Sequence, residues 1–249
     1  MDGTDGLRSA RLKVERAQHH MGSLNHSVHN YLDARPFKVT RHLEKGGAEH
    51  VYRVEVCSEP PPQLGTIVGD FFHNLRSALD AVVYALAVST KPSLTERERR
   101  RIGFPITLSP DAFNHSKIRF VPAAAQEQIE RVQPYHDPYP AEDPLWLIQS
   151  FNNIDKHREV LLVPALSMGS IRSALPKPIE DSDHALGPFE DGAELARYTF
   201  PEPKPEVDLE FTGMFDVSFG DRVLPAGIDM RLMLEHVRDS MLPNFEQFF

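Results

Sequence analysis

Residues 70–80 read DFFHNLRSALD, a stretch in which apolar side chains alternate with charged and hydrogen-bonding ones. At about 100° per residue, the apolar side chains of residues 64–89 gather on one broad arc, as in an amphipathic helix. No lysine or glutamate occurs between Asp70 and Ser89, although these residues normally fill the water-facing arc of a helix. The stretch therefore predicts a helix that other elements cover on most of its sides.

A second polar cluster, SFNNIDKHREV at residues 150–160, ends a helix that Asp143 is suited to cap and Pro144 to begin. Asp155 and Arg158 fall on or beside the apolar arc of that helix, which is not the pattern of a solvated face. The cluster therefore predicts that this helix meets another polar surface.

A buried charge without a partner is strongly destabilising, so the charges of the two helices are expected to answer one another. We expect Asp155 to pair with Arg76. Arg158 would pair with Asp80 in the same helix contact. The remaining hydrogen bonds would come from two further side chains, His73 and Asn152.

This expected contact has two interpretations. In the structural one, satisfied ion pairs fix the register of the two helices. In the functional one, the same groups line a pocket in which a histidine acts as acid or base and two arginines bind an anion. The candidate catalytic residues are His73, Arg76, Asp80, Asp155, His157 and Arg158. The paired Glu-x-x-His helices of di-metal bundles are absent, so we expect no metal and no cofactor.

The stretch HNLRSALD inside an apolar helix resembles the HEPN superfamily. That resemblance implies a small helical-bundle domain, many of whose relatives are dimeric ribonucleases in toxin, defence and RNA-processing systems. Their signature is an arginine, a frequently polar residue and a histidine further along the same helix. Two such sites meet across a dimer interface and cut RNA without metal. Arg76 and Ser77 match the start of this signature.

The rest of the signature departs from the family pattern, because Ala81, Val82 and Val83 stand where the histidine would fall. Either His157 of the other helix supplies the imidazole, or the domain is inactive as a nuclease. The sequence also resembles bacterial proteins that pair an HNLRSALD-like helix with an NNIDKHR-like one, and this likeness implies no activity.

The remaining chain predicts an α+β fold. Apolar residues from Leu7 to Tyr31 are spaced alternately by three and four, which predicts one long amphipathic helix. Residues 37–57 are typical of a β-hairpin. We expect a predominantly helical, bundle-like N-terminal two-thirds, residues 1–163, that includes this hairpin. A small antiparallel β region and a C-terminal helix, residues 164–249, would pack on that body as one compact unit.

The composition, with 41% hydrophobic and 25% charged residues, is typical of a folded globular protein. No apolar run approaches the roughly 20 residues of a membrane span, and the first residues lack a secretory signal, so we expect a cytoplasmic protein without membrane contact. The net charge of −9 argues against general nucleic-acid binding. The run TERERRR, residues 95–101, is either a solvated helix face or a local basic site. The aromatic end NFEQFF either packs on the body or forms an oligomer contact.

Three functions are compatible with this sequence. The first is a HEPN-like protein with an RNA-related or defence-related role, with RNA and a second copy of the chain, in a homodimer, as candidate partners. The second is a non-enzymatic interaction or ligand-binding protein whose polar helix contact is structural. The third is a small-molecule enzyme using His73 with Arg76 and Arg158. A nuclease needs an exposed basic groove and a small-molecule enzyme an enclosed pocket, whereas a structural contact needs neither.

Overall fold

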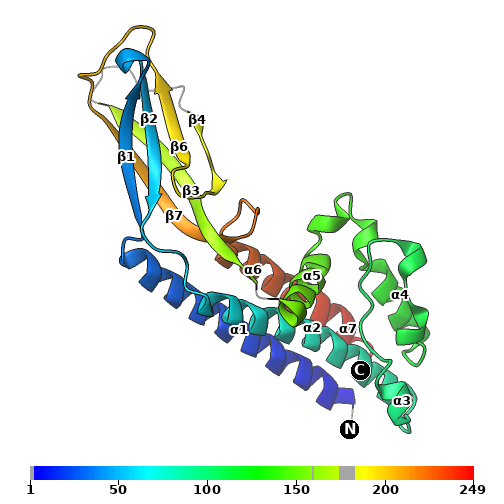
Figure 1. The fold of residues 1–249 in the computed structure, drawn as a ribbon. Helices are drawn as coiled ribbons and strands as arrows, with labels where there is room; N and C mark the ends of the chain where they lie inside the picture. The colour runs from blue at the N-terminus through cyan, green and yellow to red at the C-terminus, as the bar shows by residue number, and fades with distance from the viewer. Residues whose placement is uncertain (1–2, 159, 174–182) are drawn as a thin grey trace. The chain divides into compact units, whose positions relative to one another are not determined.

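The computed structural model describes residues 3–158, 160–173 and 183–249, and it confirms the expected α+β class (Figure 1). The α-helices are α1 (Gly3–Asp33), α2 (Gln63–Thr90), α3 (Glu96–Arg99), α4 (Ala123–Arg131), α5 (Pro144–His157), α6 (Ala226–Glu235) and α7 (Leu242–Glu246). The strands are β1 (Phe37–Glu44), β2 (Glu49–Val56), β3 (Leu162–Ser173), β4 (Asp183–His184), β5 (Gly187–Pro188), β6 (Glu194–Thr199) and β7 (Leu209–Phe219). Short 3-10 turns and a π-helical turn lie between them: η1 (Lys45–Gly47), η2 (Pro110–Ala112), η3 (His115–Lys117), η4 (Pro134–His136), η5 (Pro140–Glu142) and η6 (His236–Met241).

The chain divides into two compact units whose segments interleave along the sequence. The helical unit consists of residues 1–23, 66–160 and 230–249. The sheet unit consists of residues 24–65 and 161–229. Each unit is therefore assembled from segments that lie far apart in the sequence.

The core of the helical unit is built from the apolar faces that the sequence predicts. In α2 the side chains of Phe71, Phe72 and Leu75 are fully buried. The apolar residues at the start of the α1 stripe, from Leu7 to Ala17, are also buried, which confirms the predicted face of that helix. These faces form helices because their apolar residues recur every three or four positions, as a helix buried on one side requires.

The aromatic end of the chain packs within the helical unit. Phe245, in α7, is 1% exposed, and its ring centroid lies 6.1 Å from that of Phe104 in an edge-to-face arrangement. Arg11 of α1 is ion-paired with Glu246 at 2.5 Å. Of the two roles open for NFEQFF, packing on the body is the one that Phe245 takes.

The sheet unit contains two antiparallel sheets, with strand orders β1-β2-β6-β4 and β5-β3-β7. The predicted hairpin is confirmed: β1 and β2 pair from Phe37↔Val56 to Glu44↔Glu49 across the turn η1. That turn needs glycine, because Gly46 and Gly47 have φ values of 69° and 96°. A Cβ atom on Gly47 would also meet the ring of Pro205, so a larger residue does not fit there.

The two sheets pack face to face over an apolar core. Tyr52 and Ala196 of the first sheet share one cluster with Ile171 and Leu209 of the second. The rings of Tyr52 and Phe211 stack with centroids 5.5 Å apart. The apolar side chains of both sheets thus meet in the layer between them, as in other two-layer β structures.

Two elements differ from the sequence prediction. The hairpin pairs through β2 with β6, so it belongs to the same sheet as the later strands, whereas the sequence had placed it in the helical part. The expected C-terminal helix changes its winding at η6, where it becomes π-helical before α7 begins.

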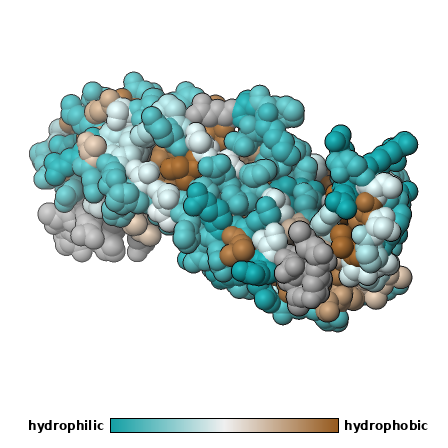
Figure 2. Space-filling model, turned by 90° about the horizontal axis from the view of Figure 1, so that it is seen from below, coloured by the Kyte–Doolittle hydropathy of each residue, from teal (hydrophilic) through white to brown (hydrophobic). Residues whose placement is uncertain are grey.

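The surface seen in Figure 2 is largely hydrophilic, and its hydrophobic residues lie in small separate patches. Of the helices that the structure describes, none is both long enough and apolar enough to cross a membrane.

Candidate functional site

The polar residues of α2 hold the backbone of a loop in the same unit. Nη2 of Arg76 donates a hydrogen bond to the carbonyl oxygen of Phe104 at 2.7 Å. Oδ1 of Asp80 accepts from the backbone N–H of Phe104 at 2.8 Å. The two side chains are also ion-paired at 3.0 Å, one helical turn apart. Arg76 and Asp80 thus bind both backbone polar groups of a single residue.

A third side chain fixes the next residue of that loop. Nε2 of Gln133, which is 2% exposed, donates to the carbonyl oxygens of Pro105 at 2.8 Å and of Ile129 at 2.9 Å. A buried backbone carbonyl without a partner is costly, so these bonds stabilise the path of residues 103–105 through the unit. No pattern in the sequence indicates that α2 would bind these residues.

The region around Arg76 holds a second cation, Lys117, so the single negative charge of Asp80 does not balance its positive charges. Burial lowers the pKa of the Arg76 guanidinium, and the Asp80 carboxylate opposes that shift. Burial also lowers the pKa of Lys117, and the nearby Arg76 lowers it further. Nη1 of Arg76 is buried and has no hydrogen-bond partner among the residues that the structure describes. Two cations and one carboxylate therefore share this region.

Helix α5 contacts α2, although not through the predicted ion pairs. The ring of Phe72 stacks on that of Phe151 with centroids 4.7 Å apart. A second contact joins Gly69, three residues before Phe72 in α2, to the carboxylate of Asp155, four residues after Phe151 in α5. A Cβ atom on Gly69 would overlap that carboxylate, so glycine permits the close approach. Asp143 caps α5 as predicted, accepting from the N–H of Leu145 at 2.8 Å.

The two predicted pairs between the helices are wrong. Within the described ranges, Arg76 is ion-paired with Asp80, and no ion pair joins it to Asp155. No ion pair joins Arg158 to Asp80 within those ranges either. The reason is that the backbone of Phe104, a partner invisible in a helical pattern, occupies both groups of α2.

The other four candidates lie at the surface of the described part of the chain. His73, Asp155, His157 and Arg158 are exposed. Asn152 is 1% exposed, yet its amide nitrogen and oxygen have no hydrogen-bond partner among the described residues. Of the six candidates, the structure brings together Arg76 and Asp80 by direct contact. In the described part of the chain, no group of three or more His, Cys, Asp or Glu side chains is arranged to hold a metal ion.

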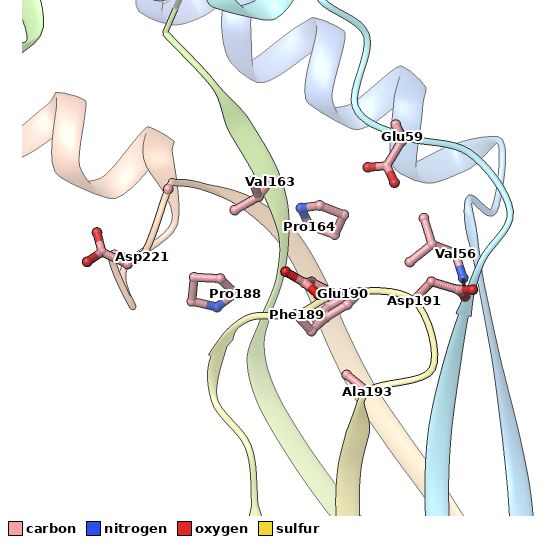
Figure 3. Close-up of a pocket in the computed structure, with 11 residues that line it drawn as sticks. Val56, Glu59, Val163, Pro164, Pro188, Phe189, Glu190, Asp191, Ala193 and Asp221 are labelled. Carbon is pink, nitrogen blue, oxygen red and sulfur yellow. Dashed lines mark hydrogen bonds between the residues drawn. The ribbon is translucent and has the colours of Figure 1, made fainter. Parts of the chain in front are cut away.

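A pocket of about 850 Å³ lies in the sheet unit and was not anticipated from the sequence (Figure 3). Its apolar walls come from the end of β2, the start of β3, β5 and the β5–β6 loop. These apolar residues are Val56, Val163, Pro164, Pro188, Phe189 and Ala193. Phe189 is 8% exposed and packs against Phe37 and Phe215 at centroid distances of 5.2 and 5.8 Å, so this wall is part of the core.

The charged side chains of the pocket are all acidic among the described lining residues: Glu59, Glu190, Asp191 and Asp221. In Figure 3, Asp221 lies toward one end of the pocket, Glu59 and Asp191 lie toward the other, and Glu190 lies between them. Oδ1 of Asp191 accepts a hydrogen bond from the N–H of Val56 at 2.8 Å, which anchors the loop to β2. Four carboxylates over an apolar wall suit a ligand that is both positively charged and partly apolar.

No spacing of residues along the chain reveals this pocket, because its lining comes from separate segments between Val56 and Asp221. Comparison with known proteins adds no assignment: no protein-family model matches the chain, and neither the curated proteins nor the solved structures include a significant match.

Proposed function

We propose that the protein is a non-enzymatic binding protein that takes an organic cation with an apolar portion into the pocket of its sheet unit. The observation that carries this proposal is the lining of the pocket, in which four carboxylates accompany six apolar side chains. A volume of about 850 Å³ lies within the range of small-molecule sites, roughly 300–1,000 Å³.

The chemistry of the lining supports a cation over other ligands. An anion would meet carboxylates with no compensating basic side chain among the described lining residues. A neutral apolar molecule would cover the carboxylates without neutralising their negative charge. An amine or guanidinium on a short apolar chain satisfies both parts of the surface, because its charge pairs with the carboxylates while its chain covers the apolar wall.

The test is calorimetric titration with spermidine, a polyamine, and in parallel with a short peptide that contains one arginine. Glu190→Gln and Asp221→Asn remove charge while keeping shape, and each is expected to weaken binding by about tenfold. Glu202→Gln is the matched control, since Glu202 is an exposed carboxylate of the same unit that does not line the pocket.

Binding that Glu202→Gln weakens as much as Glu190→Gln does would reduce the effect to general charge attraction and refute the pocket. Absence of saturable binding of both probes would also refute it. Tighter binding of spermidine than of the peptide would identify a free polyamine as the ligand. Tighter binding of the peptide would identify the basic side chain of a peptide or protein as the ligand.

RNA cleavage of the HEPN type is the second function to test. This proposal includes a homodimer, because HEPN sites meet across a dimer interface. The observation that favours it is the buried Nη1 of Arg76, which has no partner among the described residues and lies in a region shared with Lys117. The cytoplasmic location expected from the sequence belongs to the same proposal.

Its test is metal-free cleavage of a mixed-sequence RNA by the wild type and by the variants Arg76→Ala and His157→Ala. Loss of cleavage in variants that melt as the wild type does would establish a nuclease with a site split between α2 and α5. No cleavage by the wild type would leave Arg76 with its structural role at Phe104 alone.

A further inference from the structure

A basic hollow lies in the helical unit, remote in the sequence from the acidic pocket. It has a volume of about 370 Å³ and is lined by Thr95, Arg97, Glu98, Arg101 and Arg119. Three guanidinium groups thus face one carboxylate, in a protein whose net charge is −9. A concentration of positive charge against the sign of the whole chain is a local feature that total composition does not reveal.

One guanidinium of the hollow is held in a fixed position. The Arg119 guanidinium lies over the ring of Phe120, 4.3 Å from its centroid. Its Nη2 atom is 3.3 Å from Oε1 of Glu98. A side chain held by both an aromatic face and a carboxylate loses little further freedom when it binds a ligand.

The one carboxylate of the hollow is already engaged. Oε1 of Glu98 accepts from Nζ of Lys91 at 2.8 Å, and Oε2 accepts from the backbone N–H of Thr95 at 2.9 Å. The Lys91 ammonium also lies over Phe120, 4.6 Å from the ring centroid. Glu98 therefore balances one charge of the pair Lys91 and Arg119, and a positive charge remains before the other arginines are considered.

The other two arginines of the hollow have no partner among the described residues. Arg97 and Arg101 are exposed, and neither forms a hydrogen bond through its side chain or an ion pair in the described ranges. Their neighbours differ, because Arg100 is ion-paired with Glu96 at 3.0 Å and Arg99 donates to the carbonyl oxygen of Leu94 at 3.2 Å. The two arginines of this run without such a contact, Arg97 and Arg101, thus both line the hollow.

We infer that this hollow binds a phosphate group, either as free phosphate or as the monoester of a small molecule. Guanidinium groups bind phosphate oxygens through paired N–H donors, and the surplus positive charge matches a dianion. A volume of about 370 Å³ is near the lower end of small-molecule sites, so it suits a compact ligand. This inference is independent of the cation pocket, because the two sites share no residue.

The experiment is calorimetric titration with inorganic phosphate and with glycerol 3-phosphate at low and at moderate salt. The variants Arg97→Gln and Arg101→Gln are each expected to weaken binding by about tenfold. Arg100→Gln is the matched control, because it removes the same charge from the same segment without touching the hollow, and its affinity is expected to stay within about twofold of the wild type.

The outcomes separate the sources of the phosphate group. Tighter binding of glycerol 3-phosphate identifies a phosphomonoester as the ligand, and equal or tighter binding of inorganic phosphate identifies the free anion. The inference is overturned if the wild type shows no saturable binding of either probe. It is also overturned if Arg100→Gln weakens binding as much as Arg97→Gln, or if single-stranded RNA binds while excess phosphate fails to compete.

Discussion

Arg76 and Asp80 bind opposite sides of one residue, with the guanidinium on the carbonyl oxygen of Phe104 and the carboxylate on its N–H. An ion pair of 3.0 Å joins the two side chains, so each also orients the other. Arg76 and Asp80 in the middle of α2 thus have a structural role, which is to hold the backbone of this loop.

This arrangement predicts different costs for two substitutions at Asp80. Asp80→Asn keeps an oxygen that can accept from Phe104, whereas Asp80→Ala leaves that N–H without its partner. We expect Asp80→Ala to lower the free energy of unfolding by about 1–3 kcal/mol, and Asp80→Asn by clearly less. Urea denaturation of both variants checks this, and equal losses would mean that the hydrogen bond to Phe104 contributes little.

The close approach of Gly69 to Asp155 predicts a coupling between these two positions. In a helix interior, Gly→Ala normally stabilises by about 1 kcal/mol. We expect Gly69→Ala in the wild type not to raise the free energy of unfolding, because the new Cβ atom would displace the Asp155 carboxylate. In an Asp155→Ala background, the same substitution should raise the free energy of unfolding by about 1 kcal/mol.

A double-mutant cycle by urea denaturation measures this coupling. Gly22→Ala in α1 is the control, since a Cβ atom there would meet no atom within 4 Å, and it should stabilise in both backgrounds. The same effect of Gly69→Ala with and without Asp155 would contradict the contact.

The ion pairs of Glu98 predict a dependence of stability on pH. The hydrogen bond from Lys91, and after it that from the N–H of Thr95, lowers the pKa of Glu98 from 4.5 to about 2. Below pH 4.5 the unfolded chain takes up a proton that the folded chain does not. The stabilisation by Glu98 is therefore complete above pH 4.5 and is lost as the pH falls toward 2.

The difference in melting temperature between the wild type and Glu98→Gln, recorded at about pH 6, 4 and 3, measures this loss. The difference should shrink as the solution becomes more acidic. Lys91→Met removes the main cause of the shift, so in that background the difference should depend less on pH below 4.5. A difference that stays constant from pH 6 to 3 would refute the assignment.

The hydroxyl of Tyr52 predicts a modest contribution to the stability of the sheet unit. It is buried and donates to the carbonyl oxygen of Leu209 at 2.5 Å, joining residues of the two sheets. We expect Tyr52→Phe to lower the free energy of unfolding by about 1 kcal/mol. Tyr198→Phe is the control, because the Tyr198 hydroxyl makes no hydrogen bond with a described residue, and the two variants should differ in urea denaturation.

The predictions from sequence that hold concern patterns along single elements. The apolar spacing of α1, the hairpin around Gly46 and the cap of α5 by Asp143 are confirmed, because each depends on residues a few positions apart. The predicted partners of Arg76 and Asp80 are wrong, because a helical wheel shows which side chains face inward but not which segment they meet.

The sequence alone determined the α+β class, the long helices and the hairpin, since side-chain periodicity and turn residues act locally. Only the tertiary structure decided that Arg76 and Asp80 bind the backbone of Phe104, and that β2 pairs with β6. Every residue offers an N–H or a carbonyl group, so the sequence does not mark the one that a buried charge will bind. The acidic pocket likewise exists only where separate segments of the sheet unit meet in the folded chain. The basic hollow is lined by the run of residues 95–101, already marked as basic in the sequence, and by Arg119, which only the fold brings to it.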